Sequence, residues 1–273
     1  MFFDHVPQKR LVCAHRGARS IAPENTLLAM KKARECGAPC WETDVRISKD
    51  GELVVFHDDT LERTTDIATN KVFRNQTNWH VDQFSVDELR QLDAGSWFLA
   101  DDPFGTVASG EVKSNENEDI HGLQIPLFRD VLAFTKTHSF PVNVEIKDLQ
   151  TPSGDVLIVD KIIDMLRETE TTDLVLLSSF RHEYLQRAKE LCPEIAIAVL
   201  ARKQHPSNLI QYLKSFPANA YHPDIDICDD KLIVKLLNAG FRVNNWTVND
   251  VERAEAIHRL GAGVITDWPQ LLL

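Results

Sequence analysis

The chain has 273 residues, 43% of them hydrophobic, and a formal net charge of −11. This charge argues against a nucleic-acid binder and against a protein that binds membranes through basic residues, but it allows an anionic small molecule beside a bound metal ion. No apolar run approaches the roughly 20 residues that span a bilayer, and the N-terminal residues lack the pattern of a signal peptide. The five cysteines are an odd, scattered set typical of reduced thiols, so we expect a cytoplasmic protein without an integral membrane segment.

Strand-like apolar segments alternate with helical segments along most of the chain. The first strand is predicted at 11–15, and a helix follows at 24–36 and ends at Gly37. A second strand is predicted at 41–45. The later strands are predicted at 142–147, 174–179, 195–200, 220–222, 241–246 and 263–267. The later helices are predicted at 128–137, 155–168, 181–191, 207–216, 229–239 and 250–260.

Eight repeats of strand and helix predict a (β/α)₈ TIM barrel, an α/β fold, formed by residues 1–273 as a single domain. The apolar runs without strict alternation are typical of parallel strands that are buried on both faces. An open, doubly wound sheet is the alternative, because the number of strands does not show that the sheet closes. Residues 58–125 do not fit the repeat, and we interpret them as an insertion, or cap, after the second strand.

A hairpin with titratable groups at its open end is predicted after the first helix. Asp50-Gly51 is a strong signal for a two-residue turn, because such turns need positive φ at both positions. If these two residues form the loop, His57 lies opposite Asp44, and Glu42 projects to the same side. Oxygen ligands at this density suit one hard divalent cation, Mg²⁺ or Ca²⁺. A solvated strand edge is the alternative interpretation.

Further polar residues stand at the predicted C-terminal ends of the strands, where barrels of this kind collect their catalytic groups. Besides the hairpin residues, they include His15, Arg16, Glu145, Lys147 and Trp246. Carboxylates, histidines and cations converging on one rim are difficult to explain by structural roles alone. We therefore expect an active site at this rim, whereas Trp246 fits substrate stacking and rim packing equally well.

Several segments resemble the glycerophosphodiester phosphodiesterase family. They are AHRGARSIAPENTLLAM, WETDVRISKDGELVVFHDDTLERTTD, LDAGSWF, VNVEIK and VNNWTVND followed by GAGVITDWPQLL. The similarity runs from Leu11 to the C-terminus. The resemblance implies a TIM barrel with an insertion, and hydrolysis of small-molecule glycerophosphodiesters to an alcohol and sn-glycerol 3-phosphate with a divalent cation.

The resemblance also implies roles for the residues at the rim. Glu145 would complete a metal site with Glu42 and Asp44, and Lys147 would contact phosphate. Arg16 would add positive charge where negative charge develops in the transition state. His15 and His57 would act as acid and base, in an order that the sequence leaves open.

Two other functions are alternatives at this stage. One is a lysophospholipase D, which would need an apolar groove near the site for an acyl chain. The other is a non-catalytic barrel that binds glycerophosphate. The sequence of such a protein would lack one of the histidines or one of the acids of the site. The substrate's alcohol, the choice between Mg²⁺ and Ca²⁺ and the oligomeric state are left open by the sequence.

Overall fold

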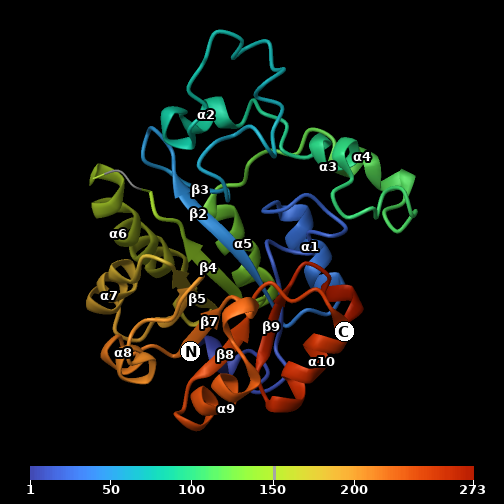
Figure 1. Ribbon diagram of the computed structural model, residues 1–273. Coiled ribbons are helices and arrows are strands. Elements are labelled where there is room, and N and C mark those ends of the chain that lie inside the picture. The colour runs from blue at the N-terminus through green and yellow to red at the C-terminus, as the bar shows by residue number, and fades with distance from the viewer. Residues whose placement is uncertain (150–151) are drawn as a thin grey trace.

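A closed barrel of parallel strands forms the centre of the molecule, as the computed structural model shows (Figure 1). The structure describes residues 1–149 and 152–273. The barrel strands are β1 (Val12–Ala14), β2 (Cys40–Ile47), β4 (Val142–Ile146), β5 (Val175–Ser179), β6 (Ala196–Ala201), β7 (Ala220–Pro223), β8 (Arg242–Asn245) and β9 (Gly263–Thr266). Because β1 pairs in parallel with both β2 and β9, the sheet closes on itself. The TIM barrel is confirmed, and the open sheet is wrong.

Helices lie around the barrel and cover the outer face of the strands (Figure 1). They are α1 (Leu27–Glu35), α5 (Phe128–His138), α6 (Pro152–Thr169), α7 (His182–Leu191), α8 (Leu209–Ser215), α9 (Asp230–Asn238) and α10 (Val251–Leu260). The cap of α1 is Thr26, whose side chain accepts a hydrogen bond from the amide of Ala29. The predicted start of this helix at residue 24 was therefore wrong.

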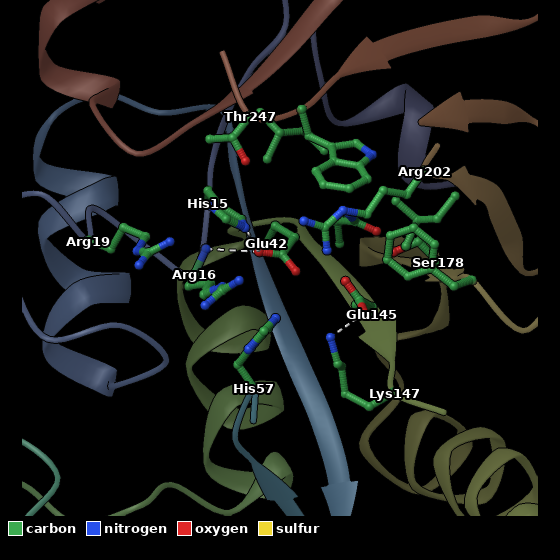
Figure 2. A pocket seen from close by; sticks show the side chains of 15 residues that line it. His15, Arg16, Arg19, Glu42, His57, Glu145, Lys147, Ser178, Arg202 and Thr247 are labelled. Carbon is green, nitrogen blue, oxygen red and sulfur yellow. Dashed lines mark hydrogen bonds and ion pairs between the residues drawn. The ribbon is translucent and has the colours of Figure 1, made fainter. Parts of the chain in front are cut away.

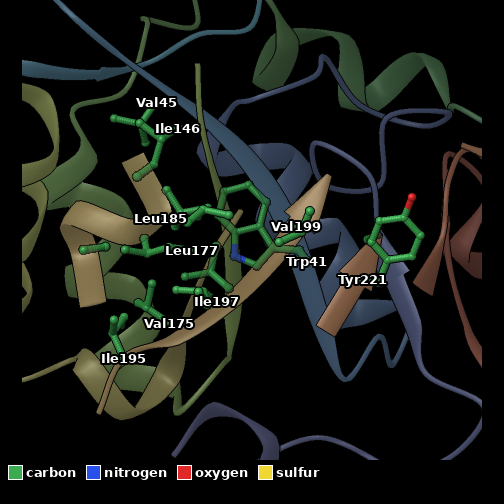
Figure 3. Packing of buried hydrophobic residues seen from close by; sticks show 14 of the residues in the cluster. Trp41, Val45, Ile146, Val175, Leu177, Leu185, Ile195, Ile197, Val199 and Tyr221 are labelled. Carbon is green, nitrogen blue, oxygen red and sulfur yellow. The ribbon is translucent and has the colours of Figure 1, made fainter. Parts of the chain in front are cut away.

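The apolar core has two main parts, which take alternate residues of the same strands. The larger part packs the strands against the helices and includes Leu177 and Val199 with Leu185 of α7 (Figure 3). A smaller cluster takes the intervening residues, among them Leu176 and Ala198. Since side chains alternate along a strand, the smaller cluster fills the barrel interior. Residues that lie two positions from members of the smaller cluster on the same strand therefore also point into the barrel, toward its mouth.

The hairpin is present, but its register differs from the predicted one by one residue. Strand β3 (Leu53–Val55) pairs antiparallel with β2 and places Val55 opposite Val45. The amide of Phe56 donates to the carbonyl of Asp44, so Phe56, and not His57, lies opposite Asp44.

The register shift follows from a longer loop at the hairpin tip. The amide of Ser48 donates to the carbonyl of Glu52, which leaves Lys49, Asp50 and Gly51 in the loop. Gly51 has φ +83°, as in three-residue hairpin loops that end in a left-handed residue. An Asp-Gly pair suits this loop as well as a two-residue turn, which is why the sequence predicted the wrong register.

The segment between β3 and α5 contains only short helices and lies beyond β3 and α1 (Figure 1). These are η2 (Val81–Gln83), α2 (Val86–Leu89), α3 (Ser96–Asp101), η3 (Ser114–Glu116) and α4 (Asn117–Ile120). Two small apolar clusters lie in this part of the molecule, one around Phe73 and Phe84, which also contains Val54 of β3, and one around Phe98 and Ile120. The division into a barrel domain and an insertion at 58–125 stays a prediction.

Four further short helices are η1 (Phe2–Asp4), η4 (Thr172–Leu174), η5 (Ile225–Ile227) and η6 (Pro269–Leu271). Across the described residues, no helix is both long enough and apolar enough to cross a membrane.

Candidate active site

A cavity of about 590 Å³ lies at the C-terminal ends of the barrel strands (Figure 2). Seven of the eight predicted site residues line it, and the eighth, Asp44, is buried directly beside them. The full lining is His15, Arg16, Arg19, Glu42, His57, Asn143, Glu145, Lys147, Ser178, Phe180, Leu200, Arg202, Trp246, Thr247 and Ile265. The structure thus brings the predicted residues together.

Three carboxylates meet at one side of this cavity. Glu42, Asp44 and Glu145 each offer an oxygen, and these oxygens lie within 4.8 Å of one another. Glu42 and Asp44 are two apart on β2, and Glu145 is the register partner of Asp44 on β4. Burial and the charges of Asp44 and Glu145 raise the pKa of Glu42 well above its usual range. Such a crowded set of buried carboxylates fits a divalent cation, which would neutralise the repulsion.

One oxygen of this cluster supports the same interpretation. Asp44 Oδ1 is buried and makes no hydrogen bond to any described residue. Asp44 Oδ2 accepts a hydrogen bond from the side-chain amide of Asn25 at 2.8 Å, which fixes the orientation of the carboxylate. A buried carboxylate oxygen without a hydrogen bond, in a side chain that lies beside two other acids, fits the oxygen-rich donor set that Mg²⁺ and Ca²⁺ prefer.

Two cationic side chains border the carboxylates. Lys147 Nζ lies 2.6 Å from Glu145 Oε1 and 3.5 Å from Asp44 Oδ1, and Arg16 Nε lies 3.6 Å from Asp44 Oδ2. Burial alone would raise the pKa of Asp44, but the charges of His57, Lys147 and Arg16 lower it below its usual range. Asp44 is therefore ionised in its folded environment at neutral pH.

His15 is held by a carboxylate from the last strand of the barrel. Its Nδ1 lies 2.6 Å from Asp267 Oδ1, and Asp267 Oδ2 accepts from the side-chain amide of Asn249 at 2.8 Å. His15 Nε2 lies 4.0 Å from Glu42 Oε2. Burial and the neighbouring Arg16 lower the pKa of His15 to about 4. Asp267 was not predicted as a site residue, although it lies two residues after the inward-facing Ile265.

His57 has a carboxylate partner of the same kind. Its Nδ1 lies 2.5 Å from Asp58 Oδ1, and Arg63 donates to the other oxygen of Asp58 at 2.6 Å. The guanidinium of Arg46 also holds the His57 carbonyl, at 3.0 and 2.8 Å. His57 reaches the cavity despite the shifted register because β3 ends at Val55, after which the alternation of faces no longer applies.

Glu24 joins the site to the segment that follows β3. Its oxygens lie 2.8 Å from Arg16 Nη1, 2.8 Å from Arg19 Nη2 and 2.7 Å from Arg63 Nη2. Although burial opposes ionisation, these arginines hold the pKa of Glu24 well below its usual range. Glu24 therefore belongs to the site rather than to the cap of the following helix, which is Thr26.

Trp246 lies at the rim of the cavity, where it combines two roles. Its indole Nε1 donates to the carbonyl of His222 at 2.8 Å, and its ring meets the edge of Phe180 with centroids 5.5 Å apart. His222 itself is buried beside Asn244 and does not line the cavity. Trp246 is thus fixed by rim packing and also lines the cavity.

Comparison with known proteins agrees with this geometry. The sequence model of the Glycerophosphoryl diester phosphodiesterase family matches residues 15–271. The chain belongs to this family. A glycerophosphodiester phosphodiesterase of Caldanaerobacter subterraneus is 32% identical over 97% of both chains, and one of Bacillus altitudinis is 32% identical over 94% of both.

A solved structure of an Oleispira antarctica phosphodiesterase is also similar, with a TM-score of 0.81 and 28% identity. It covers 99% of this chain and 96% of that one, and it is described as a complex with the product sn-glycerol 3-phosphate. These likenesses confirm the predicted family, the fold and the enzyme class: the chain is a glycerophosphodiester phosphodiesterase.

Proposed function

We propose that the protein hydrolyses glycerophosphodiesters to an alcohol and sn-glycerol 3-phosphate, with one divalent cation, Mg²⁺ or Ca²⁺, and two histidines. The observation that carries this proposal is the meeting of Glu42, Asp44 and Glu145 with two aspartate-bonded histidines in one cavity. The product bound by the Oleispira relative supports the glycerol 3-phosphate part of the substrate. The cytoplasm is the proposed location.

Glu42, Asp44 and Glu145 would hold the cation. Bound there, it would supply neutralisation of charge on the phosphoryl oxygens and acidification of a neighbouring hydroxyl. A phosphodiester is an anion, so further positive charge lowers the barrier to attack by an oxygen nucleophile. Arg16 and Lys147 border the same carboxylates and would hold the remaining phosphoryl oxygens by charge-assisted hydrogen bonds.

His15 and His57 would move the protons. Each ring bonds an aspartate through Nδ1, which leaves Nε2 as the nitrogen that serves the reaction. In the first step, one histidine takes the proton of the glycerol 2-hydroxyl as this oxygen bonds to phosphorus. The other histidine protonates the leaving alcohol as its bond to phosphorus breaks. In the second step, water opens the cyclic phosphate and the two roles exchange.

A lysophospholipase D activity is a second candidate. Phe180, Leu200 and Trp246 give the cavity an apolar wall, which could contact the first carbons of an acyl chain. This candidate predicts that lysophosphatidylcholine is hydrolysed at least as efficiently as a glycerophosphodiester without an acyl chain.

A coupled assay for sn-glycerol 3-phosphate tests the proposal. Several glycerophosphodiesters are incubated with the enzyme, with and without EDTA. Lysophosphatidylcholine is incubated in parallel and its hydrolysis is followed by choline release, because its other product keeps the acyl chain and is not sn-glycerol 3-phosphate. We expect release from the glycerophosphodiesters, its loss in EDTA and its recovery when Mg²⁺ or Ca²⁺ is added in excess. Release that continues after exhaustive chelation would contradict the metal, and no release from any diester would contradict the reaction.

A further inference from the structure

The cavity has a floor of small, buried polar side chains. Asn143 and Ser178 line it from β4 and β5 and are almost completely buried. Asn143 Oδ1 and Ser178 Oγ make no hydrogen bond to any described residue. Because a buried polar atom without a partner is costly, these atoms suit the hydroxyl groups of a bound ligand. The floor therefore fits the glycerol part of the substrate.

The rim on the same side of the cavity is built differently. Phe180 stands two residues after Ser178, and Arg202 stands two residues after Leu200, just past the end of β6. Both residues lie just past the ends of their strands, and both side chains line the cavity. Figure 2 shows the Arg202 side chain reaching from its loop into the cavity, whose wall it forms together with Phe180 and Leu200.

Arg202 differs from the other cations of the cavity in how little it is engaged. Its Nε lies 3.9 Å from Asp224 Oδ2, and its side chain is 68% exposed. In contrast, Arg16 and Arg19 each lie 2.8 Å from Glu24, and Lys147 lies 2.6 Å from Glu145. Among the described lining residues, Arg202 is therefore the cation with most capacity to bind a further anion.

A shallow trough continues from this rim away from the floor. Phe180, Leu200 and Arg202 also line a neighbouring cavity of about 260 Å³, which extends to Gln204 and Pro206. The trough thus offers space for a group attached to the far side of the phosphate.

Two histidines of this trough are already occupied. His182 bonds the Tyr212 hydroxyl and the Leu200 carbonyl, and His205 bonds the Tyr221 hydroxyl and the Ile227 carbonyl. Both ring nitrogens of each histidine therefore have partners. Arg202 is left as the charged group that a ligand in the described part of the trough would meet.

We propose that Phe180, Leu200 and Arg202 form the subsite for the alcohol, and that Arg202 selects alcohols carrying an anionic group such as a phosphate or a carboxylate. The planar guanidinium binds such oxyanions through paired hydrogen bonds, while the two apolar side chains pack against the carbon skeleton. A quaternary ammonium is repelled by the same charge. This inference rests on the proposed function and specifies its substrate class.

A matched pair of substrates tests the subsite. Glycerophosphoinositol and glycerophosphoinositol 4-phosphate differ only in one phosphate on the alcohol, and ³¹P NMR follows the loss of the diester whichever ester bond breaks. The quantity compared is the kcat/KM for glycerophosphoinositol 4-phosphate divided by the kcat/KM for glycerophosphoinositol. We expect Arg202→Gln to lower this ratio about tenfold or more, because the variant loses a charge-assisted hydrogen bond to the second phosphate. Arg202→Lys should restore part of the ratio.

Lys203→Gln is the matched control, because it removes the same charge one residue along, at an exposed side chain that lines neither cavity. This variant should leave the ratio at the wild-type value. Wild-type enzyme should also hydrolyse glycerophosphoinositol 4-phosphate with a higher kcat/KM than glycerophosphocholine.

An unchanged ratio in Arg202→Gln would overturn the subsite, and so would a wild-type preference for glycerophosphocholine or for lysophosphatidylcholine. Equal losses on both inositol substrates leave the ratio unchanged and would place Arg202 at the reacting phosphate instead. If wild-type enzyme consumes neither diester, the proposed function fails and the subsite with it. If it consumes both with a ratio that Arg202→Gln does not alter, the subsite fails alone.

Discussion

Each of the two histidines in the cavity is oriented by an aspartate, and the two aspartates come from distant parts of the chain. Asp58 directly follows His57, whereas Asp267 reaches His15 because β9 pairs with β1. In both cases the bonded nitrogen is Nδ1. This arrangement fixes the ring and its tautomer, and it stabilises the imidazolium that forms during proton transfer.

Removal of either imidazole should slow the chemical step. General acid–base catalysis by one side chain is typically worth about 10²–10⁴-fold, so His15→Ala and His57→Ala should each lower kcat by about that factor. Because the two histidines act as a unit, the double variant should lose less than the product of the single losses. Circular dichroism and a metal titration must accompany the kinetics. Near-wild-type kcat in either single variant, on a diester that the enzyme hydrolyses, would exclude the two-histidine mechanism.

Asp267, which bonds His15, should affect kcat although it does not contact the substrate. Asp267→Asn keeps the size of the side chain but removes its charge and favours the wrong tautomer of His15. By analogy with a catalytic triad, where this exchange costs about 10⁴-fold, we expect kcat to fall by about 10²–10⁴-fold with a smaller change in KM. Steady-state kinetics measures this split. Glu255→Gln, which alters an exposed carboxylate paired with Arg10, should leave kcat unchanged. A fall in metal affinity as large as the fall in kcat would point to a general distortion of the site instead.

At the scale of elements, the site depends on the close approach of the loop after β1 to helix α1. Gly17 follows Arg16 in this loop and has φ +85°. A Cβ at this position would lie 2.6 Å from the backbone carbon of Ala29 in α1. This close contact holds the loop against the first helix. It therefore helps to fix the positions of His15 and Arg16, which the loop carries.

Gly17→Ala should therefore destabilise the protein more than a glycine replacement in open space. Strain in the left-handed region and overpacking against α1 together should lower the free energy of unfolding by about 2–5 kcal/mol. Gly240→Ala is the control, because Gly240 has φ +92° but nothing within 4 Å of an added Cβ, so about 1 kcal/mol is expected there. Urea denaturation compares the two. Equal losses in both variants would show that the approach to α1 does not constrain the loop.

At the scale of the whole molecule, the carboxylate cluster links metal binding to folding. Glu42 and Asp44 on β2 and Glu145 on β4 repel one another across a buried site, and they meet only when β2 pairs with β4 in the folded protein. A cation that binds this cluster binds the folded state and not the unfolded chain. Its binding free energy therefore adds to the stability of the barrel.

A divalent cation should accordingly raise the denaturation midpoint. At a free concentration of one hundred times Kd, the expected gain in the free energy of unfolding is about 2.7 kcal/mol. Urea denaturation in EDTA, and then in excess Mg²⁺ or Ca²⁺, measures this gain. A monovalent salt of equal ionic strength controls for screening. Glu145→Gln should lose most of the gain, and coincident wild-type curves in EDTA and in both cations would argue against a metal site at these residues.

Much of the fold and of the site followed from local patterns in the sequence. The alternation of apolar runs and helical segments predicted the repeats of the barrel, and the two-residue spacing of Glu42 and Asp44 placed both on one face of a strand. Contacts of this kind depend on neighbours in the chain, so the sequence determines them directly.

Other features were decided by the tertiary structure. An Asp-Gly pair allows two loop lengths, and only pairing with β2 selected the longer one. Glu24 contacts Arg16 and Arg19 of its own loop and Arg63 of the segment after β3, and only the folded chain brings Arg63 to it. Asp267 reaches His15 because β9 pairs with β1 where the sheet closes, and Arg202 reaches the cavity from just past the end of β6. Such contacts join residues far apart in the chain, so their geometry exists only once the barrel has formed.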